Sequence, residues 1–224
     1  MESFLRRLKF YGIGFGIGLI AVFLIFGNRA CNWGPKQRIK NSIKERIIVL
    51  NERNDSIRKQ NGISDAELIS HIEDGDIFFN RSKTENPLRV YHFESESENF
   101  NVTIPENSFL SEIVFEPSDA QSIFNSEKGF GNIIYFPKDK DLFYVPKNTH
   151  LDSIMLQLGC KDGNDLFELI KKSGKINFNK SRLNEPWNLN HVFSIYANNK
   201  TAEISSIWYK EKIEVTDIQI INHQ

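Results

Sequence analysis

Two histidines occupy the same place in a repeated stretch of this 224-residue chain, and imidazole is the side chain best suited to acid–base chemistry near neutral pH. His92 and His191 each lie on an expected strand that follows a proline-bearing loop. No serine, cysteine or carboxylate is placed beside either histidine by its spacing. Two interpretations stay open: a catalytic or ligand-binding histidine, and a strand histidine bonded to the backbone. The second is favoured because no partner can be named.

The loops before these histidines hold cations together with small polar residues. Backbone amides and paired cations of this kind can bind an anion. The same residues also suit a simple turn, since Asn and Ser side chains bond their own backbone. The candidate anion-binding residues are Asn80, Arg81, Ser82 and Lys83 in the first loop, and Asn179, Lys180, Ser181 and Arg182 in the second.

Common signatures of cofactor and metal sites are not found in the sequence. There is no phosphate-cradling glycine loop, no His-Glu-x-x-His, no Gly-x-Ser-x-Gly and no Cys-x-x-Cys. The two cysteines, Cys31 and Cys160, have no metal-ligand spacing and define no disulfide framework. The sequence therefore predicts no cofactor and no metal, and it favours a protein that is not an enzyme.

A self-match at nearly constant offset indicates a duplicated unit. The stretch from Gly75 to Ser82 returns from Gly174 to Ser181 with five identities. The stretch 55–62 returns as 152–159, and Pro87 and His92 return as Pro186 and His191, so that the offset drifts from about 97 to about 99 residues.

Apolar periodicity and turn residues place the same elements in each copy. Ser64 with Glu67 predicts a capping box, and Gly62, Gly75, Gly159 and Gly174 are expected to end helices. Expected helices cover 56–60, 64–74, 149–158 and 165–173, and expected strands cover 77–79, 90–93, 100–104, 110–115, 133–136, 142–145, 176–178, 191–196, 202–209 and 212–220. The expected fold is α+β: two related small modules, each of two helices and an antiparallel sheet of about four strands.

The chain begins with an uncharged apolar run at residues 10–27, which is long enough to cross a bilayer. The sequence thus predicts an uncleaved transmembrane helix ahead of the modules, and a single-pass protein of the bacterial inner membrane with the lipid bilayer as a partner. Basic residues flank the run on both sides and leave the side of the body open. Small residues spaced by four, Gly12 with Gly16 and Gly14 with Gly18, suggest self-association between such helices.

The expected organisation therefore has six parts. They are a basic tail (1–9), the transmembrane helix (10–27), a basic juxtamembrane segment (28–54), a first module (55–115), a hairpin bridge (116–148) and a second module (149–224). In the juxtamembrane segment, Ile39, Ile43, Ile47 and Leu50 form one apolar stripe of a helix after Pro35, although Ile48 and Val49 also suit a strand.

Charge is unevenly distributed and bears on partners. Residues 28–60 carry nine Lys and Arg against three Asp and Glu, whereas residues 61–224 carry sixteen against twenty-five. An acidic body repels phosphate backbones, so nucleic acid is an unfavoured partner.

The Gly-Asp-Ile-x-Phe-x-Arg-Ser motif, a following proline and a tyrosine-bearing strand resemble the bacterial family named domain of unknown function 4258. Its small membrane-anchored members have a Cys–aromatic–Pro–Arg juncture, matched here by Cys31, Trp33, Pro35 and Arg38. Leu88 and Trp187 stand where such members often have cysteine. The resemblance covers residues 1–104 and, through the repeat, 152–209, and it implies no activity.

Two further resemblances are narrower. The helix-then-strands plan is similar to that of RelE-like ribonuclease toxins, which would make His92, His191, Arg81 and Lys180 the catalytic candidates. Residues 144–154 look like the first half of a LysM-type glycan-binding repeat, whose second half is missing. With no site assembled from motifs, we expect a binding or scaffolding protein with an unknown protein partner, and keep ribonuclease-like and glycan-binding functions as alternatives.

Overall fold

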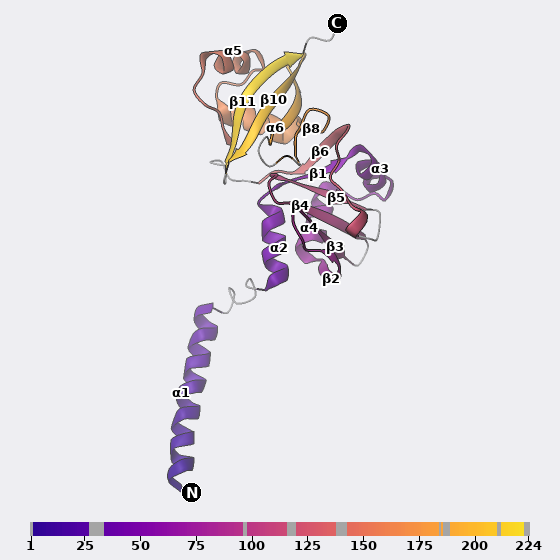
Figure 1. Ribbon diagram of the computed structural model, residues 1–224. Helices are drawn as coiled ribbons and strands as arrows, with labels where there is room; N and C mark the ends of the chain where they lie inside the picture. The colour runs from indigo at the N-terminus through magenta and orange to yellow at the C-terminus, as the bar shows by residue number, and fades with distance from the viewer. Residues whose placement is uncertain are drawn as a thin grey trace. The chain divides into compact units, whose positions relative to one another are not determined.

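The computed structural model describes residues 2–26, 34–95, 98–115, 120–137, 143–183, 185, 189–209 and 212–221, which divide into two units, Met1–Asn41 and Ser42–Gln224. Figure 1 labels most of the elements. The helices are α1 (Glu2–Phe26), α2 (Pro35–Lys44), α3 (Glu52–Gln60), α4 (Asp65–Asp74), the short 3₁₀ turn η2 (Ala120–Ser122), α5 (Thr149–Gln157) and α6 (Gly163–Ser173). The strands are β1 (Ile47–Asn51), β2 (Asp76–Lys83), β3 (Leu88–Glu94), β4 (Asn99–Pro105), β5 (Leu110–Val114), β6 (Phe130–Tyr135), β7 (Phe143–Tyr144), β8 (Lys175–Asn177), β9 (His191–Ala197), β10 (Lys200–Tyr209) and β11 (Lys212–Ile221).

The first unit contains α1, and its properties correct the prediction of a membrane anchor. The side chains of α1 that the structure describes run from Arg7 to Val22 and include two cations and four glycines. Over the described residues, no helix combines the length and the apolar character that crossing a membrane requires. This finding overturns the transmembrane helix at residues 10–27 and the single-pass membrane localisation. Contact between helices through the four glycines stays a prediction.

The second unit is built on one mixed sheet and not on two separate modules. Its eleven strands lie in the order β2-β3-β4-β5-β1-β6-β8-β9-β10-β11-β7. The prediction of two small modules with separate sheets is therefore wrong. The reason is β6, which pairs antiparallel with β1 on one side and with β8 on the other, and so joins the two sets of strands.

The expected hairpin in the bridge does not form, because its two strands find other partners. β6 lies between β1 and β8, whereas β7 pairs in parallel with β11 at the far end of the sheet. Gly131 in β6 allows a close approach at this seam, since a Cβ there would lie 2.8 Å from the Phe178 ring. The bridge thus contributes two strands to the sheet at different places.

The two halves of the sheet repeat one plan within the joined structure. Each half begins with a strand, continues with two helices and ends with four strands. In each half the first strand pairs in parallel with the last, β1 with β5 and β7 with β11. The spatial orders β2-β3-β4-β5-β1 and β8-β9-β10-β11-β7 therefore correspond strand for strand.

Local turn chemistry ends the helices at matching places in both halves. Gly62 and Gly159 have φ of 71° and 85°, a left-handed conformation that residues other than glycine rarely adopt. Gly75 and Gly174 each cap a helix, and a Cβ on either would lie 2.4 Å from the carbonyl oxygen four residues earlier. The predicted capping box at Ser64 is confirmed, because the Ser64 hydroxyl accepts from Glu67 N and the Glu67 carboxylate accepts from Ser64 N.

The apolar stripe of the juxtamembrane segment divides between two elements. α2 ends at Lys44, and Ile47 then begins β1, whose residues 47–50 are all buried. These residues form a strand and not a longer helix because β1 pairs with β5 on one edge and β6 on the other, which satisfies the hydrogen bonds of its backbone.

The main core joins side chains from both halves. Ile47, Val49, Phe109 and Leu110 pack in one cluster with residues of α5, α6 and β8–β11. Aromatic rings pack face to face at Phe93–Phe100, with centroids 5.4 Å apart. The predicted juncture residues Cys31 and Trp33, and the repeat residues Pro186 and Trp187, lie outside the described part of the chain.

Candidate functional site

His92 lies on β3 in a small polar group of the first half. Its Nδ1 shares a hydrogen bond of 3.1 Å with Asn101 Oδ1, and its Nε2 lies 3.4 Å from Glu94 Oε1. Arg81 donates to the same Glu94 oxygen at 2.5 Å. The sequence had placed no carboxylate beside His92, whereas the structure supplies Glu94, two residues along the same strand. His92 is only 4% exposed, so a substrate has little access to its ring.

His191 matches His92 in the sequence repeat but lies one position away from it in the strand pairing, and it connects the two halves. Its Nε2 accepts from the backbone N–H of Phe109 at 3.2 Å and lies 3.1 Å from the Ser108 hydroxyl. The pKa of His191 is lowered to about 4: burial is the main cause, a backbone bond at Ser206 opposes the shift, and the positive charge of Arg46 adds to it. The ring is therefore neutral and holds the β4–β5 loop against β9.

The serine hydroxyls of the two loops bond to the backbone of their own turn, and the bonds are the same in the two halves. Ser82 Oγ donates to Phe78 O at 2.7 Å and accepts from His92 N at 3.0 Å. Ser181 Oγ donates to Asn177 O at 2.7 Å and accepts from Val192 N at 3.0 Å. Both hydroxyls replace a strand-to-strand backbone bond where the pairing is interrupted.

The predicted loop cations separate into two kinds. Arg81 and Lys180 pair with carboxylates, Arg81 with Glu94 and Lys180 with Glu203, each at 2.5 Å. Asn179 accepts from Gly129 N at 3.3 Å, and Asn80 is exposed. Lys83 and Arg182 form no ion pair with any described residue, and each lines a hollow of the surface. The last residue of each loop, and not its centre, is therefore the candidate for contact with a ligand.

The larger hollow has a volume of about 770 Å³, which is in the range of ligand-binding cavities. Four apolar side chains of its wall come from three separate segments: Pro87 and Leu88, Pro105, and Leu183. Phe124 also lines it and is 74% exposed, the second most exposed of the large apolar side chains that the structure describes. An exposed phenylalanine at the mouth of an apolar hollow is an unusual arrangement for a surface that meets only water.

One buried polar atom of this hollow has no partner in the described part of the chain. Asn125 is 8% exposed, and its Oδ1 accepts no hydrogen bond from any described residue. Buried carbonyl oxygens are normally satisfied, so this atom is available to a donor from outside. Asn125 lines the hollow beside Phe124.

A smaller hollow of about 220 Å³ adjoins the first, since both include Glu127 and Leu183 in their walls. We call the two together the inter-loop cleft: it runs from Lys83 past the 124–128 segment to Arg182. Its charged wall residues balance, with Lys83, Lys128 and Arg182 against Glu106, Glu127 and Glu185. The last residues of both sequence-predicted loops thus border one elongated depression.

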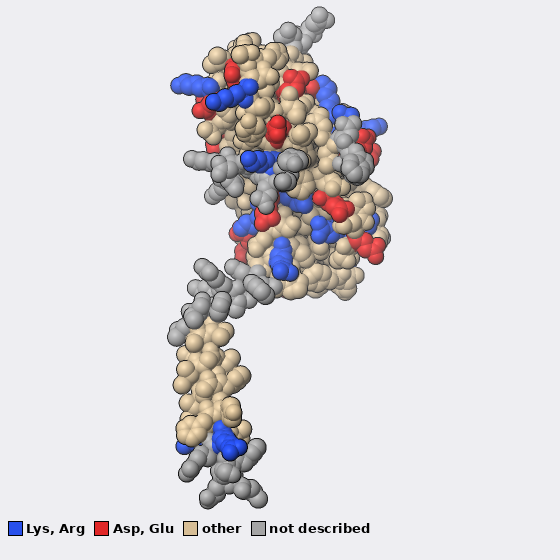
Figure 2. Space-filling view, turned by 60° about the vertical axis from the view of Figure 1, so that its left-hand side comes forward, with Lys and Arg blue, Asp and Glu red and all other residues tan. Residues whose placement is uncertain are grey.

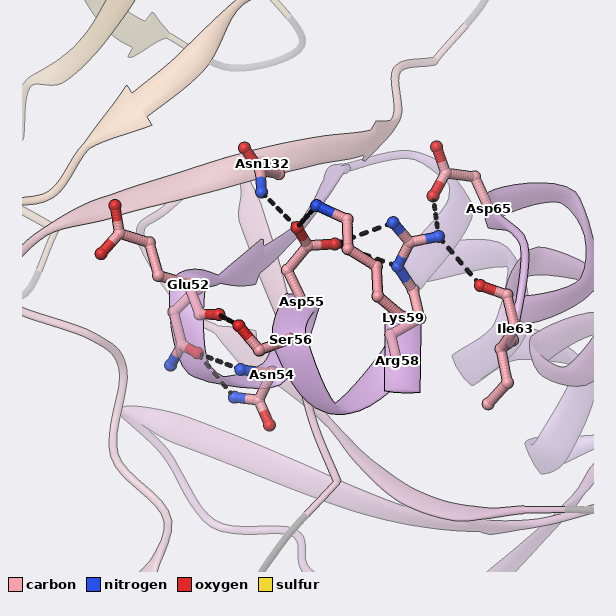
Figure 3. Close-up of polar contacts among 10 residues, drawn as sticks. Glu52, Asn54, Asp55, Ser56, Arg58, Lys59, Ile63, Asp65 and Asn132 are labelled. Atoms are coloured by element: carbon pink, nitrogen blue, oxygen red, sulfur yellow. Dashed lines mark hydrogen bonds and ion pairs between the residues drawn. The ribbon is translucent and has the colours of Figure 1, made fainter. Parts of the chain in front are cut away.

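A second polar cluster, on α3, is structural because both carboxylate oxygens of Asp55 are occupied by protein donors (Figure 3). Asp55 Oδ1 accepts from Arg58, and Oδ2 accepts from Asn132 at 2.7 Å and Lys59 at 2.6 Å. Burial alone would raise the pKa of Asp55, but the bonds from Lys59 and Arg58 outweigh it and lower that pKa. The cluster ties α3 to β6, and through Asp65 to α4.

Glu112 on β5 is a buried carboxylate that also has protein partners. Ser126 donates to it through N at 2.8 Å and Oγ at 2.5 Å, and Asn51 Nδ2 donates at 2.9 Å. Burial raises the pKa of Glu112, and these bonds oppose the rise. By fixing Ser126, Glu112 positions the segment that carries Phe124 and Asn125.

No group of three or more His, Cys, Asp or Glu side chains that could hold a metal ion occurs among the described residues. Comparison with models of protein families, with curated proteins and with solved structures gives no match to this chain. The likeness to domain of unknown function 4258 stays a prediction. The cleft must accordingly be interpreted from its own chemistry.

The sequence could not have located Phe124 or Asn125 as site residues. They lie in the part of the chain that has no repeat partner, and no motif surrounds them. The only available signal is that Ile123-Phe124 is apolar between polar residues, and this pattern equally suits a buried turn. Ile123 is in fact buried, whereas Phe124 is not.

Proposed function

We propose that this chain is a binding protein whose inter-loop cleft takes an extended apolar peptide segment of a partner protein. The observation that carries the proposal is the 770 Å³ hollow with the exposed Phe124 and the unpartnered Asn125 Oδ1 in its wall. Apolar side chains of the peptide would fill the hollow, and a main-chain N–H would donate to Asn125 Oδ1.

The shape and charge of the cleft support a peptide. Two adjoining hollows that share a wall suit an extended chain, which presents side chains at regular intervals. Three cations and three carboxylates border the cleft, so it favours a segment without strong net charge. On the face that Figure 2 shows, cations and anions are likewise interspersed, and this face offers no single-sign field to steer a nucleic acid.

The same observations weigh against the ribonuclease-like alternative. A general acid or base must reach its substrate within hydrogen-bonding distance. Both histidine candidates are buried, and Arg81 and Lys180, the cationic candidates, are already paired with carboxylates. A non-enzymatic binding role therefore accounts for more of the geometry.

The test is selection of random peptides displayed on phage against the full chain, followed by fluorescence polarisation of the enriched peptides. We expect enrichment of apolar residues without net charge. Phe124→Ser should weaken binding by about tenfold, because it removes exposed apolar area worth roughly 1–2 kcal/mol from the wall.

Leu156→Ser is the matched control. Leu156 is 64% exposed on α5 and lines none of the hollows described above, so its loss should leave affinity unchanged. Enriched peptides that bind wild type and Phe124→Ser equally, or that carry strong positive or negative charge, would refute the cleft as the binding site.

A further inference from the structure

Arg46 is a buried arginine whose charge meets no carboxylate partner among the described residues. It is 8% exposed, and its NH1 donates to the carbonyl oxygens of Pro105, at 3.0 Å, and Ser108. Its guanidinium lies over the Trp208 ring, with Cζ 5.3 Å from the ring centroid. Two carbonyls and an indole thus fix its position, but none of them neutralises its charge.

A second arginine, Arg89, lies close to the first. Arg89 on β3 stands opposite Ile104 on β4, and the next residue, Pro105, supplies the carbonyl that binds Arg46. Burial is the main cause that lowers the pKa of Arg46 to about 10, and the positive charge of Arg89 adds to it. Glu45 opposes the shift, but it is exposed and pairs with neither arginine.

Two N–H donors of this neighbourhood are buried without an acceptor in the described part of the chain. They are Arg89 Nε and Trp208 Nε1. Buried donors are normally bonded, and two like charges at low dielectric repel each other. One group would relieve both defects: an anion with several acceptor oxygens.

We propose that Arg46, Arg89 and the indole N–H of Trp208 form a binding site for an oxyanion of the phosphate or sulfate type. Guanidinium forks bond two oxygens of such an anion in parallel, and they tolerate stacking on an aromatic ring. The site is distinct from the inter-loop cleft. Leu88 and Val90 pack towards Ala120 and Ile123, and strand alternation places Arg89 on the opposite face of β3.

The experiment is titration of the full-length, ¹⁵N-labelled chain with sodium phosphate, with the Trp208 indole N–H resonance as the readout. Trp208→Phe identifies that resonance among the three tryptophans. We expect a saturable shift with phosphate and sulfate that sodium chloride at equal ionic strength does not reproduce. Arg89→Met should weaken phosphate binding at least tenfold. Arg89→Lys should give an intermediate affinity, since lysine keeps the charge without the paired N–H groups of the guanidinium.

Arg182→Met is the control, because Arg182 is an exposed arginine without a described ion pair on another part of the surface. It should leave the phosphate affinity unchanged. A shift that follows ionic strength alone, or that persists at full affinity in both Arg89 variants, would overturn the proposal. Peptide binding in the cleft is a separate measurement, so failure of either proposal can be recognised without the other.

Discussion

His92 and His191 follow the same repeated loop, yet their rings bond to different kinds of partner. His92 bonds within its own half, to Asn101 on the neighbouring strand and beside Glu94 on its own strand. His191 reaches across to Ser108 and Phe109 of the other half. The strand pairing explains the difference: Ile77 pairs with Phe93 and Ile176 with Phe193, so His191 stands one residue out of register with His92 and on the opposite face of its strand.

Matching residues of the two halves keep the same hydrogen bonds where those bonds lie within a turn. The hydroxyls of Ser82 and Ser181 make the same two bonds at the same distances. Asp55 and Asp152, which match in the repeat, have diverged: Asp55 is buried among cations, while Asp152 is exposed on α5. Local backbone chemistry is retained in both halves, and side chains that meet other elements differ.

The largest expected effect is at His191. His191→Ala should cost about 4 kcal/mol of unfolding free energy, because it leaves the buried Phe109 N–H without an acceptor and opens a cavity. His92→Ala should cost about 2 kcal/mol, since the His92 ring bonds to the Asn101 side chain and not to a buried backbone N–H. Urea denaturation of both variants gives the comparison, and equal losses would show that His191 does not join the halves.

The pH dependence of stability provides the control for that assignment. His191 has a folded pKa of about 4, below the ordinary value of 6.5. The unfolded chain therefore binds more protons between these values, and stability should fall by up to about 3 kcal/mol as pH drops from 6.5 to 4. His191→Gln should remove this part of the pH dependence. A variant that keeps the full slope would assign it to another group.

A smaller difference in lost stability is expected between variants of Asp55 and Asp152. Asp55→Asn should cost about 2 kcal/mol, because charge-assisted bonds from Arg58 and Lys59 are weakened in a site where the carboxylate is only 5% exposed. Its folded pKa lies below 3.8, so the contribution should persist until pH falls through that lowered value. Asp152→Asn should change thermal stability by less than about 0.5 kcal/mol. Similar losses at both positions would contradict the divergence.

The smallest loss of unfolding free energy is expected for the two loop serines, whose hydrogen bonds are the same in both halves. Ser82→Ala and Ser181→Ala should each cost about 1 kcal/mol, because each removes one hydroxyl that satisfies two backbone groups. Chemical denaturation of the two single variants should give nearly the same loss. A difference of more than about 1 kcal/mol would show that one of the loops is supported by something beyond its own turn.

Sequence reasoning located elements whose signals are local. The capping box at Ser64 and the left-handed glycines 62 and 159 were readable because the residues that decide them are neighbours in the chain. The single sheet that joins the halves could not be predicted from the sequence. The β6 pairings connect residues far apart in the chain, and any apolar strand offers the same kind of edge. Periodicity indicates that a strand exists, but it does not identify the partner of that strand.

The candidate cleft shows the same limit. Lys83 and Arg182 were among the residues singled out from the repeat, but the wall that faces them includes Phe124 and Asn125 from the unrepeated bridge. The membrane prediction came from the length and missing charge of residues 10–27, and the properties of the described helix overturn it.

The position of β6 has a consequence for the order in which the chain assembles. β6 follows the first half in sequence and precedes the second, so residues 47–135 contain every strand from β1 to β6. During synthesis this part can form a six-stranded sheet while the remainder is still being made. Until β8 arrives, β6 is the edge strand at which an incomplete molecule would recruit a second copy, so interrupted synthesis should favour aggregation at this seam.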